Sequence, residues 1–394
     1  MPPSIDQFLD LATLQYDGAD HADRRAQPRA IVEAQPALAE DIAVAAVLGR
    51  SRTVATLLAA APSLAKRAQG TRRRSPLFYL AYGRVLAPRE GESVAEAARL
   101  LLAAGADPDE HEWWGGQYRF TVLTGVLGEG ESGPARQPAH PEWEALMALL
   151  LGAGARPDEG QGLYNRMFTG RMDHLPPLLA RGLGPQTPAN WRICEGVEET
   201  ESRSILSMLL AWDVEHGNAD RAALLLAAGA TPPEPTTGEP SPWRKALLHG
   251  HREICALLEA HRLGPEPIGP AERLVAALLS ANEHVARALL AEAPALLDDA
   301  VRLQPSLLTL AAMRPGTATL SLALTLGLSP DQRDGRGATA LHAVAAAGRL
   351  DAIEGLLAAG ADPRLVDAQH QATAAGWAAW HGQAEAADRL RRGE

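Results

Sequence analysis

The sequence predicts an all-α chain built from short helices that pack side by side, and three observations carry this prediction. Hydrophobic residues, mostly Ala and Leu, make up 46% of the 394 residues, whereas aromatic residues make up only 4%. This composition favours a core of closely packed helices. No run of alternating β-branched residues, as a strand would require, occurs along the chain. Gly and Pro recur at the ends of leucine-rich segments, where they are helix stop signals.

The leucine-rich segments end in nearly the same way. Each leucine run is interpreted as the buried stripe of a helix, followed by a Gly that tolerates positive φ and a Pro that cannot continue the helix. The best preserved copies are LLLAAGADP (100–108), LLLGAGARP (149–157), LLLAAGATP (224–232) and LLAAGADP (356–363).

A shorter apolar helix is predicted before each leucine-rich one. ATALHAVAAAG (338–348), for example, directly precedes RLDAIEGLLAAG (349–360). Two antiparallel helices cannot bury both of their apolar stripes against each other alone. Neighbouring pairs must therefore stack, as they do in repeat proteins.

At this point the chain resembles the ankyrin-repeat family, in a degenerate, bacterial type with loop insertions. The best copy is DGRGATALHAVAAAGRLDAIEGLLAAGADP (334–363), with a turn, a T-x-L-H first helix and a second helix ending in L-L-x-x-G-A-D-P. Good copies also occur at 211–232 and 372–390. TVLT (121–124) and SPLF (75–78) are weaker matches, standing where the family has T-P-L-H.

The resemblance covers nearly the whole chain and implies one solenoid of about eleven helix-turn-helix units over residues 1–394. We expect degenerate repeats in 1–75, insertion-bearing repeats in 76–203, and more regular repeats with a C-terminal cap in 204–394. In this family the concave side of the solenoid binds other proteins. The resemblance also gives His342, in T-A-L-H, a structural role.

Proline spacings locate the insertions. Regular units are 33 residues apart, as between Pro330 and Pro363, but the spacings that end at Pro108, Pro157 and Pro232 are 46, 49 and 47 residues. Such excess length marks inserted loops in the N-terminal two-thirds of the chain. The inserted segments are GRVLAPREGES (83–93), DEHEWWGGQYRF (109–120) with EGESGPARQPAHPEW (129–143), and PQTPANWRICEGVEETESR (185–203).

Aromatic residues concentrate around these insertions although they are scarce elsewhere. Such a concentration is typical of a binding hot spot or an apolar ligand pocket. If the solenoid is regular, the segment 109–120 and the loop before Ser204 could wall one pocket. We expect the binding residues to be Trp113, Trp114, Tyr118, Phe120, Trp143, Tyr164, Asn165, Trp191 and Trp212.

The leading hypothesis is a non-catalytic, monomeric interaction protein that binds a protein or peptide partner through its concave face and the loops of residues 109–203. The formal net charge of −11 would suit a basic partner. The alternative is an enzyme or small-molecule binder that uses the same loops as a pocket. Its acid and base groups would be Glu129, Glu131 and His140, with His174 as a further candidate.

Several other function classes find no support in the sequence. An acidic chain whose one basic run is Arg72–Arg74 lacks a phosphate-tracking surface, so no nucleic acid is expected. No metal-ligand spacing, dinucleotide fingerprint or phosphate-binding loop occurs, so no metal and no cofactor are expected. Two cysteines, no leader-like N-terminus and no apolar run of 18 residues lead us to expect a cytoplasmic protein without a membrane segment.

Overall fold

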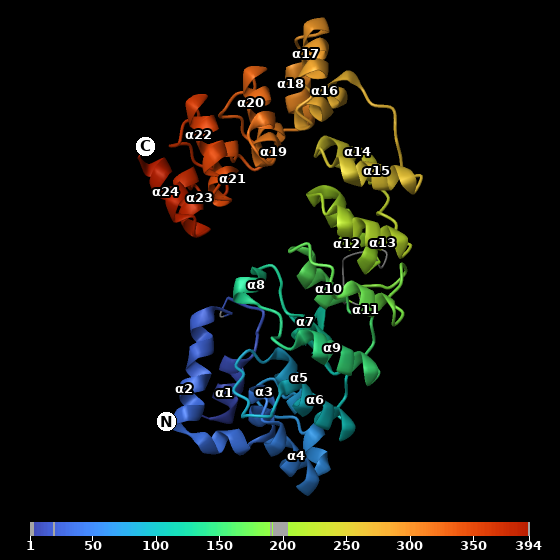
Figure 1. Cartoon of the computed structure of the whole chain (residues 1–394), viewed down its shortest axis with the longest axis vertical. Helices are drawn as coiled ribbons and strands as arrows, with labels where there is room; N and C mark the ends of the chain where they lie inside the picture. Colours follow the sequence, from blue (N-terminus) through green and yellow to red (C-terminus); the bar gives the residue numbers. More distant parts are fainter. Residues whose placement is uncertain (1–3, 19, 190, 192–203, 393–394) are drawn as a thin grey trace. The chain divides into compact units, whose positions relative to one another are not determined.

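The chain is mainly α-helical, which confirms the predicted all-α class (Figure 1). The computed structural model describes residues 4–18, 20–189, 191 and 204–392. Within these residues it contains 24 α-helices, three short 3₁₀ helices and one two-stranded hairpin. The chain divides into two compact units, the first formed by residues 1–213 and 220–233 and the second by residues 214–219 and 234–394.

The first unit contains the N-terminal helices, the hairpin and the insertion-bearing helix pairs. Helices α12 and α13 belong to it for most of their length. Its elements are α1 Ile5–Ala12, η1 Ala22–Ala26, α2 Gln27–Ala34, η2 Pro36–Glu40, α3 Ile42–Leu48, α4 Ser51–Ala60, η3 Pro62–Lys66, α5 Pro76–Tyr82, α6 Val94–Ala103, β1 His111–Trp114, β2 Tyr118–Thr121, α7 Val122–Leu127, α8 Gly133–Arg136, α9 Trp143–Gly152, α10 Gly160–Met167, α11 Leu175–Leu179, α12 Ile205–His216 and α13 Ala219–Ala227.

Successive helix pairs of the first unit stack in two layers. The first helices α3, α5 and α7 pack against one another in that order, and the second helices α4, α6 and α9 do the same. Gly49 separates α3 from α4 with a φ of 76°, in the left-handed region that favours glycine. Its backbone also lies close to Val94, because a Cβ there would come within 2.8 Å of the Val94 side chain. A Gly stop signal thus sets both the turn and the approach of the next pair.

Two insertions lie between the helices of a pair, where the proline spacings predict them. Residues 83–93 separate α5 from α6, and residues 128–142 separate α7 from α9. The second insertion is closed at both ends, because the Glu129 N–H donates to the Gln137 carbonyl (2.6 Å) and the His140 N–H donates to the Val126 carbonyl (3.0 Å). It is therefore a folded loop that contains the short helix α8.

Arg84 fastens this loop to the helix layers. Its buried guanidinium donates to the carbonyls of Ala81, Gly83, Gly125 and Pro138 at 2.6–3.0 Å. These carbonyls lie in or next to α5, at the middle of α7 and in the 128–142 insertion. Burial lowers the pKa of Arg84 to about 10. The guanidinium replaces backbone hydrogen bonds that an irregular loop cannot make for itself.

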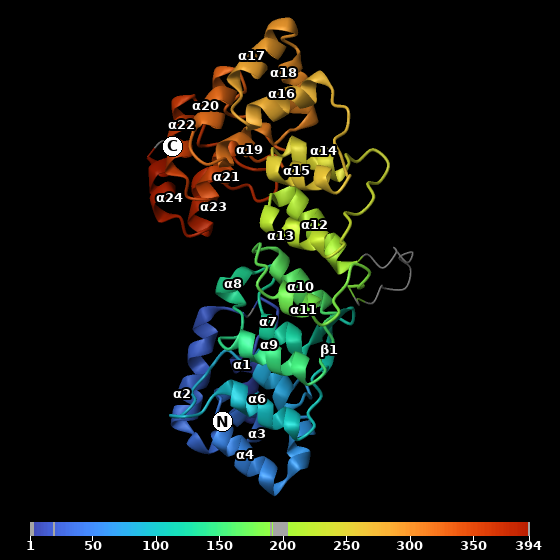
Figure 2. The ribbon, with the colours of Figure 1, turned by 45° about the vertical axis from the view of Figure 1, so that its right-hand side comes forward.

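The expectation of a chain without strands misses one hairpin, labelled at β1 in Figure 2. Strands β1 and β2 pair antiparallel, with Trp114 opposite Tyr118 and Glu112 opposite Phe120. Gly115, in the connecting turn, has a φ of 56°, which a residue with a Cβ seldom adopts. The two Gly residues between aromatic runs in HEWWGGQYRF are a hairpin signal. The signal is short and is easily missed in a chain dominated by helix patterns.

The second unit consists of helix pairs with one additional helix, α18. Its first helices pack in the order α14, α16, α19, α21 and α23. The elements are α14 Pro242–Leu248, α15 Arg252–Ala260, α16 Pro270–Leu279, α17 Glu283–Glu292, α18 Leu296–Leu303, α19 Leu307–Met313, α20 Ala318–Thr325, α21 Ala340–Ala346, α22 Leu350–Ala358, α23 Ala374–Trp380 and α24 Ala384–Arg391.

The T-A-L-H segment of the second unit forms a helix cap. Thr339 and His342 complete a capping box at the start of α21, and His342 Nε2 lies 3.1 Å from the Ala372 carbonyl of the next pair. His342 thus links two neighbouring pairs. In α23, Trp377 donates its indole N–H to Asp367 (3.0 Å), whereas Trp380 is 88% exposed and does not cover the core.

Replacing Arg84 with Met should lower the free energy of unfolding by about 2–3 kcal/mol, because four buried carbonyls lose their donor. The midpoint of urea denaturation, followed by circular dichroism, measures this change. Arg99→Met is the matched control, since Arg99 is an exposed residue of α6 that pairs with Glu96 at the surface. Equal midpoints for the two variants would contradict the fastening role of Arg84.

Candidate functional site

The first unit contains a cavity of about 320 Å³, which we call the aromatic cavity. Ligand pockets in proteins start at about this volume. Its walls come from the N-terminal segment, the hairpin, the 128–142 insertion, α10 and Trp191. The lining residues are Tyr16, Trp114, Tyr118, Phe120, Gly130, Glu131, Ser132, Gln137, Gln161, Tyr164, Asn165 and Trp191.

The hairpin supplies three aromatic side chains from one face. Residues opposite each other in an antiparallel pair point to the same face, and successive residues alternate between faces. Trp114 and Tyr118 are opposite each other, and Phe120 is two residues further along. All three therefore line the cavity. Trp113 alternates to the other face, where its ring lies 5.8 Å from that of His111.

Helix α10 supplies the polar side of the cavity. Gln161, Tyr164 and Asn165 lie three and four residues apart, so they share one face of the helix. Gln161 Nε2 donates to Asn165 Oδ1 at 2.8 Å. Tyr164 Oη donates to Glu131 Oε1 at 2.6 Å, which joins α10 to the 128–142 insertion.

Glu159 determines where α10 begins. Its buried carboxylate accepts hydrogen bonds from the hydroxyls of Thr121 (2.5 Å) and Thr124 and from the Gly162 N–H (3.1 Å). Thr121 is both the last residue of β2 and the N-cap of α7. Burial raises the pKa of Glu159, and the hydrogen bonds oppose that rise. One carboxylate therefore fixes the hairpin, α7 and α10 relative to one another.

Trp191 is brought to the cavity by the segment that precedes it. The Ile205 N–H donates to the Thr187 carbonyl at 2.9 Å, so the start of α12 holds this segment in place. The segment lies directly against α10, because a Cβ on Gly160 would come within 1.9 Å of the Ala189 carbonyl oxygen. Only glycine allows this approach, two residues before Trp191.

Two lining residues come from segments far apart in the sequence, and Asp20 joins them. Tyr16 has a φ of 59°, and its N–H donates to the Asp20 carboxylate at 2.7 Å, as does the Gln15 N–H at 3.0 Å. Asp20 also accepts from Gln137 Nε2 at 3.3 Å. Because a carboxylate accepts only, the amide nitrogen of Gln137 must face Asp20. Its Oε1 is thereby turned away from that contact.

The aromatic rings form a connected wall. Trp191 meets Tyr118 and Tyr164 with centroids 5.6 and 5.4 Å apart and interplanar angles of 78° and 86°. Tyr16 meets Phe120 at 4.8 Å and 65°. Steep angles of this kind turn the wall around the cavity instead of extending it as a flat platform. Each such ring pair contributes about 0.5–1.5 kcal/mol beyond its buried area.

Five buried polar atoms of the lining have no hydrogen-bond partner among the described residues. They are Tyr16 Oη, Gln137 Oε1, Gln161 Oε1, Asn165 Nδ2 and Trp191 Nε1. Burial raises the pKa of Tyr16, and the Arg84 charge and the Asn165 side chain oppose that rise. A buried polar group without a partner costs about 1–3 kcal/mol. These five atoms have almost no accessible surface, so they lie within the wall and not on its open face.

Glu131 is the one charged side chain among the described residues that line the cavity. It is exposed, as are Ser132 and Trp114, which places these three at the mouth. The hydrogen bond from Tyr164 holds its carboxylate there. Burial and the neighbouring Glu131 carboxylate raise the pKa of Tyr164.

The other acid and base candidates do not line the cavity. Glu129 is fully buried and accepts from Thr169 Oγ1 at 2.7 Å and from Arg171 Nη1 at 3.2 Å. Arg166 Nε lies 3.9 Å away and donates to the Leu127 carbonyl. This carboxylate therefore neutralises the buried Arg166 and the partly exposed Arg171, and it ties the 128–142 insertion to α10.

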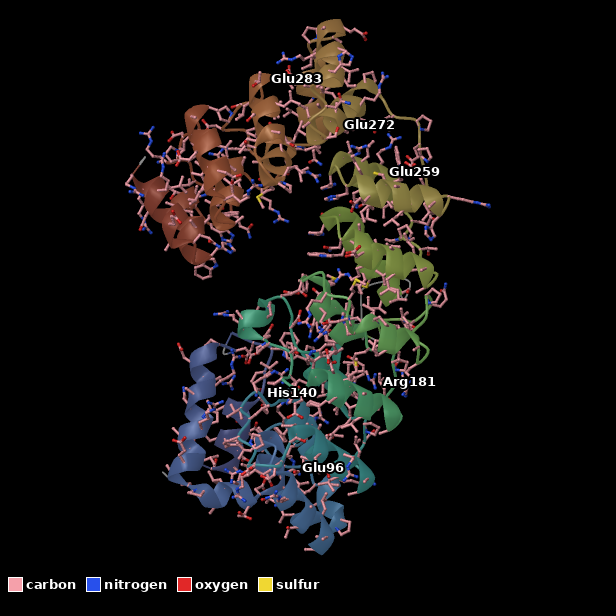
Figure 3. The ribbon with its side chains drawn as sticks, in the orientation of Figure 1. Glu96, His140, Arg181, Glu259, Glu272 and Glu283 are labelled. Carbon is pink, nitrogen blue, oxygen red and sulfur yellow. The ribbon has the colours of Figure 1, made fainter. Side chains whose placement is uncertain are left out.

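The two histidine candidates are also buried away from the cavity. His140, labelled in Figure 3, accepts the Glu142 N–H at its Nδ1 (3.0 Å), and burial lowers its pKa well below the usual value. His174 lies beside Asp173, with Nδ1 3.4 Å from Oδ1. Burial lowers the pKa of His174 to about 4 although Asp173 opposes that shift. Both imidazoles are neutral at pH 7.

Trp143 and Trp212 also lie outside the lining. Trp143 begins α9, and its ring lies under the guanidinium of Arg166, 4.5 Å from the ring centroid. Trp212 contacts Phe168, with ring centroids 5.1 Å apart. Phe168 in turn contacts Tyr164 at 5.2 Å, so Trp212 supports the wall from behind.

Sequence reasoning misses Tyr16, Gln137 and Gln161 as lining residues. Nothing in their sequence neighbourhood signals binding, because Tyr16 belongs to a non-repetitive N-terminal segment and the two glutamines are ordinary polar residues. A helical projection from Asn165 gives Gln161 one turn earlier, and that signal could have found it.

Among the described residues, no group of three or more His, Cys, Asp or Glu side chains is placed to hold a metal ion. No helix in the described ranges is long and apolar enough to cross a membrane. Of the loop 185–203, residue 190 and residues 192–203, with Cys194 and the four glutamates, lie outside the part that the structure describes.

Comparison with known proteins adds no relative: no family model matches the chain, and no curated protein is significantly similar to it. The geometry of the aromatic cavity therefore carries the functional argument.

Gly160→Ala should displace the 187–191 segment, because the added Cβ overlaps the Ala189 carbonyl. We expect Trp191 fluorescence to shift to longer wavelength as the indole leaves the ring wall. The measurement uses a variant in which the other tryptophans near the cavity are Phe. Gly152→Ala is the control, since a Cβ there meets nothing within 4 Å. An unchanged spectrum in Gly160→Ala would refute this placement of Trp191.

His174 should make the protein less stable as the pH falls. Its folded pKa of about 4 lies below the ordinary value of 6.5, so the unfolded chain takes up a proton first. The resulting stability is present above about pH 6.5 and is lost toward pH 4, by roughly 2–3 kcal/mol. His174→Gln should reduce the difference between urea midpoints at pH 7.5 and pH 4.5. The exposed His21→Gln should leave that difference unchanged.

Proposed function

We propose that this chain is a non-catalytic binding protein, an ankyrin-type solenoid whose ligand site is the aromatic cavity. One observation carries the proposal. A cavity of about 320 Å³ is lined by six aromatic side chains together with polar side chains of α10 and of the 128–142 insertion. Ligand pockets typically combine an aromatic or apolar wall with a few polar groups that orient the ligand.

The ankyrin-type solenoid is supported by the way the helix pairs stack. In the first unit, the first helices α3, α5 and α7 pack on one another, and so do the second helices α4, α6 and α9. In the second unit, the T-A-L-H cap reaches from one pair to the next through His342 Nε2. Both features agree with the resemblance seen in residues 334–363.

Binding is favoured over catalysis because the acid and base candidates are separated. Glu131 is at the cavity mouth, whereas Glu129 is engaged by Arg171 and Thr169, and His140 is buried. A general acid–base pair must lie within hydrogen-bond reach of the reacting group. In the described part of the chain, Tyr16 and Tyr164 line the cavity together with Glu131, and the pKa of each of these two tyrosines is raised. Neither phenol is a ready base at neutral pH.

The size of the cavity limits the ligand. About 320 Å³ accommodates a small molecule or one side chain of a peptide, and not a folded segment. We therefore propose that a protein or peptide partner would bind by inserting one of its side chains into the cavity. The bound group would contact the aromatic side chains that line the cavity.

A thermal-shift screen of host metabolites and short peptides should find at least one ligand that raises Tm. Trp191→Ala should then weaken its affinity about 30-fold or more, because a central tryptophan is typically a hot spot. Titration calorimetry measures the affinity. Trp113→Ala is the matched control, since Trp113 is on the opposite face of the same hairpin. Equal losses in both variants, or none in either, would place the ligand elsewhere.

A further inference from the structure

We infer that the aromatic cavity selects an organic cation, an ammonium or guanidinium group with N–H donors. The inference rests on the proposed binding function and deepens it by naming the chemistry of the ligand. Two features of the described lining carry it: the sign of its charge and its aromatic rings.

The described lining offers a carboxylate and no cationic side chain. Glu131 is the one ionised group among the described lining residues. The nearest cations behind Tyr16 are occupied: Arg84 binds four backbone carbonyls, and Arg72 binds Glu112 and the Leu14 carbonyl. An anionic ligand would therefore meet a carboxylate at the mouth and find no cationic partner in the lining. A cation would gain a charge-assisted contact with Glu131.

The rings of the lining meet edge to face and do not form a flat platform. Tyr118 and Tyr164 stand at 78° and 86° to Trp191. Six aromatic side chains line the cavity, and the faces of aromatic rings carry negative quadrupole charge, which attracts a cation. A neutral sugar or planar base would instead stack on one or two roughly parallel faces.

Two kinds of ligand carry such a cation. One is a free amine or guanidine, and the other is a peptide with a lysine or arginine side chain. The formal net charge of −11 attracts either at low ionic strength. Both sources present a cationic head on a short alkyl stem, which suits a cavity of about 320 Å³. Calorimetry with free cations and with peptides distinguishes the two.

Titration calorimetry of the full chain with n-butylguanidinium, n-butylammonium and n-butylurea tests the inference directly. Butylurea has the shape of the guanidinium ligand without its charge. We expect at least one cation to bind about tenfold or more tighter than butylurea, through the ring faces and the carboxylate. Peptides Ac-Gly-Arg-Gly-NH₂ and Ac-Gly-citrulline-Gly-NH₂ form the second arm. If the arginine peptide binds more tightly than free butylguanidinium, the ligand is a peptide. If butylguanidinium binds more tightly, the ligand is a free cation.

Glu131→Gln should weaken cation binding about fivefold to tenfold and leave butylurea unchanged, since the amide still accepts from Tyr164 but has no charge. Glu144→Gln is the control, because Glu144 is exposed on α9 and does not line the cavity. If butylurea binds as tightly as the cations and Trp191→Ala abolishes its binding, the cation inference falls and the binding function stands. If no probe binds at millimolar concentration, the inference also falls, and the metabolite screen decides the binding function separately.

Discussion

The buried carboxylate of Glu159 is the contact on which the aromatic cavity depends. It accepts from Thr121, which ends β2, from Thr124 of α7 and from Gly162 of α10. The hairpin and α10, which supply half of the lining residues, thus share one anchor with α7. Because each residue of a helix turns by about 100°, a shift of one residue at the start of α10 would carry its polar face out of the cavity. The low dielectric around Glu159 strengthens these hydrogen bonds and makes their loss costly.

The polar residues of the 128–142 insertion divide into an internal and an external set. Glu129 and His140 are buried, and Arg84 ties the loop to the helix carbonyls. These groups make an irregular segment part of the core, because they satisfy backbone and side-chain groups that would otherwise be unpaired. Glu131 alone carries charge to the cavity mouth. The loop is therefore packed as part of the core, which would lower the entropic cost of binding at the proposed ligand site.

The helix pairs and the positions of the insertions could be predicted because their signals are local. Gly49 and the prolines stop helices wherever they stand, and the start of α9 at Trp143 follows from the pattern around it. Six of the nine residues predicted to bind line the cavity. They could be predicted because the aromatic residues of the sequence concentrate in this region. In HEWW, successive side chains point to opposite faces of the hairpin, so Trp114 lines the cavity and Trp113 does not. This distinction requires the hairpin register, which a helix-based interpretation of the chain does not provide.

By itself, the sequence determined the helical class, the stacked pairs, the inserted loops and the aromatic concentration between residues 109 and 191. These depend on φ preferences, helix stops and composition, which act over a few residues. Only the tertiary structure decided that Tyr16 and Gln137 meet through Asp20, that Glu129 is internal and that Glu131 is external. Contacts between residues more than 100 positions apart depend on how whole elements pack, and no local pattern encodes them.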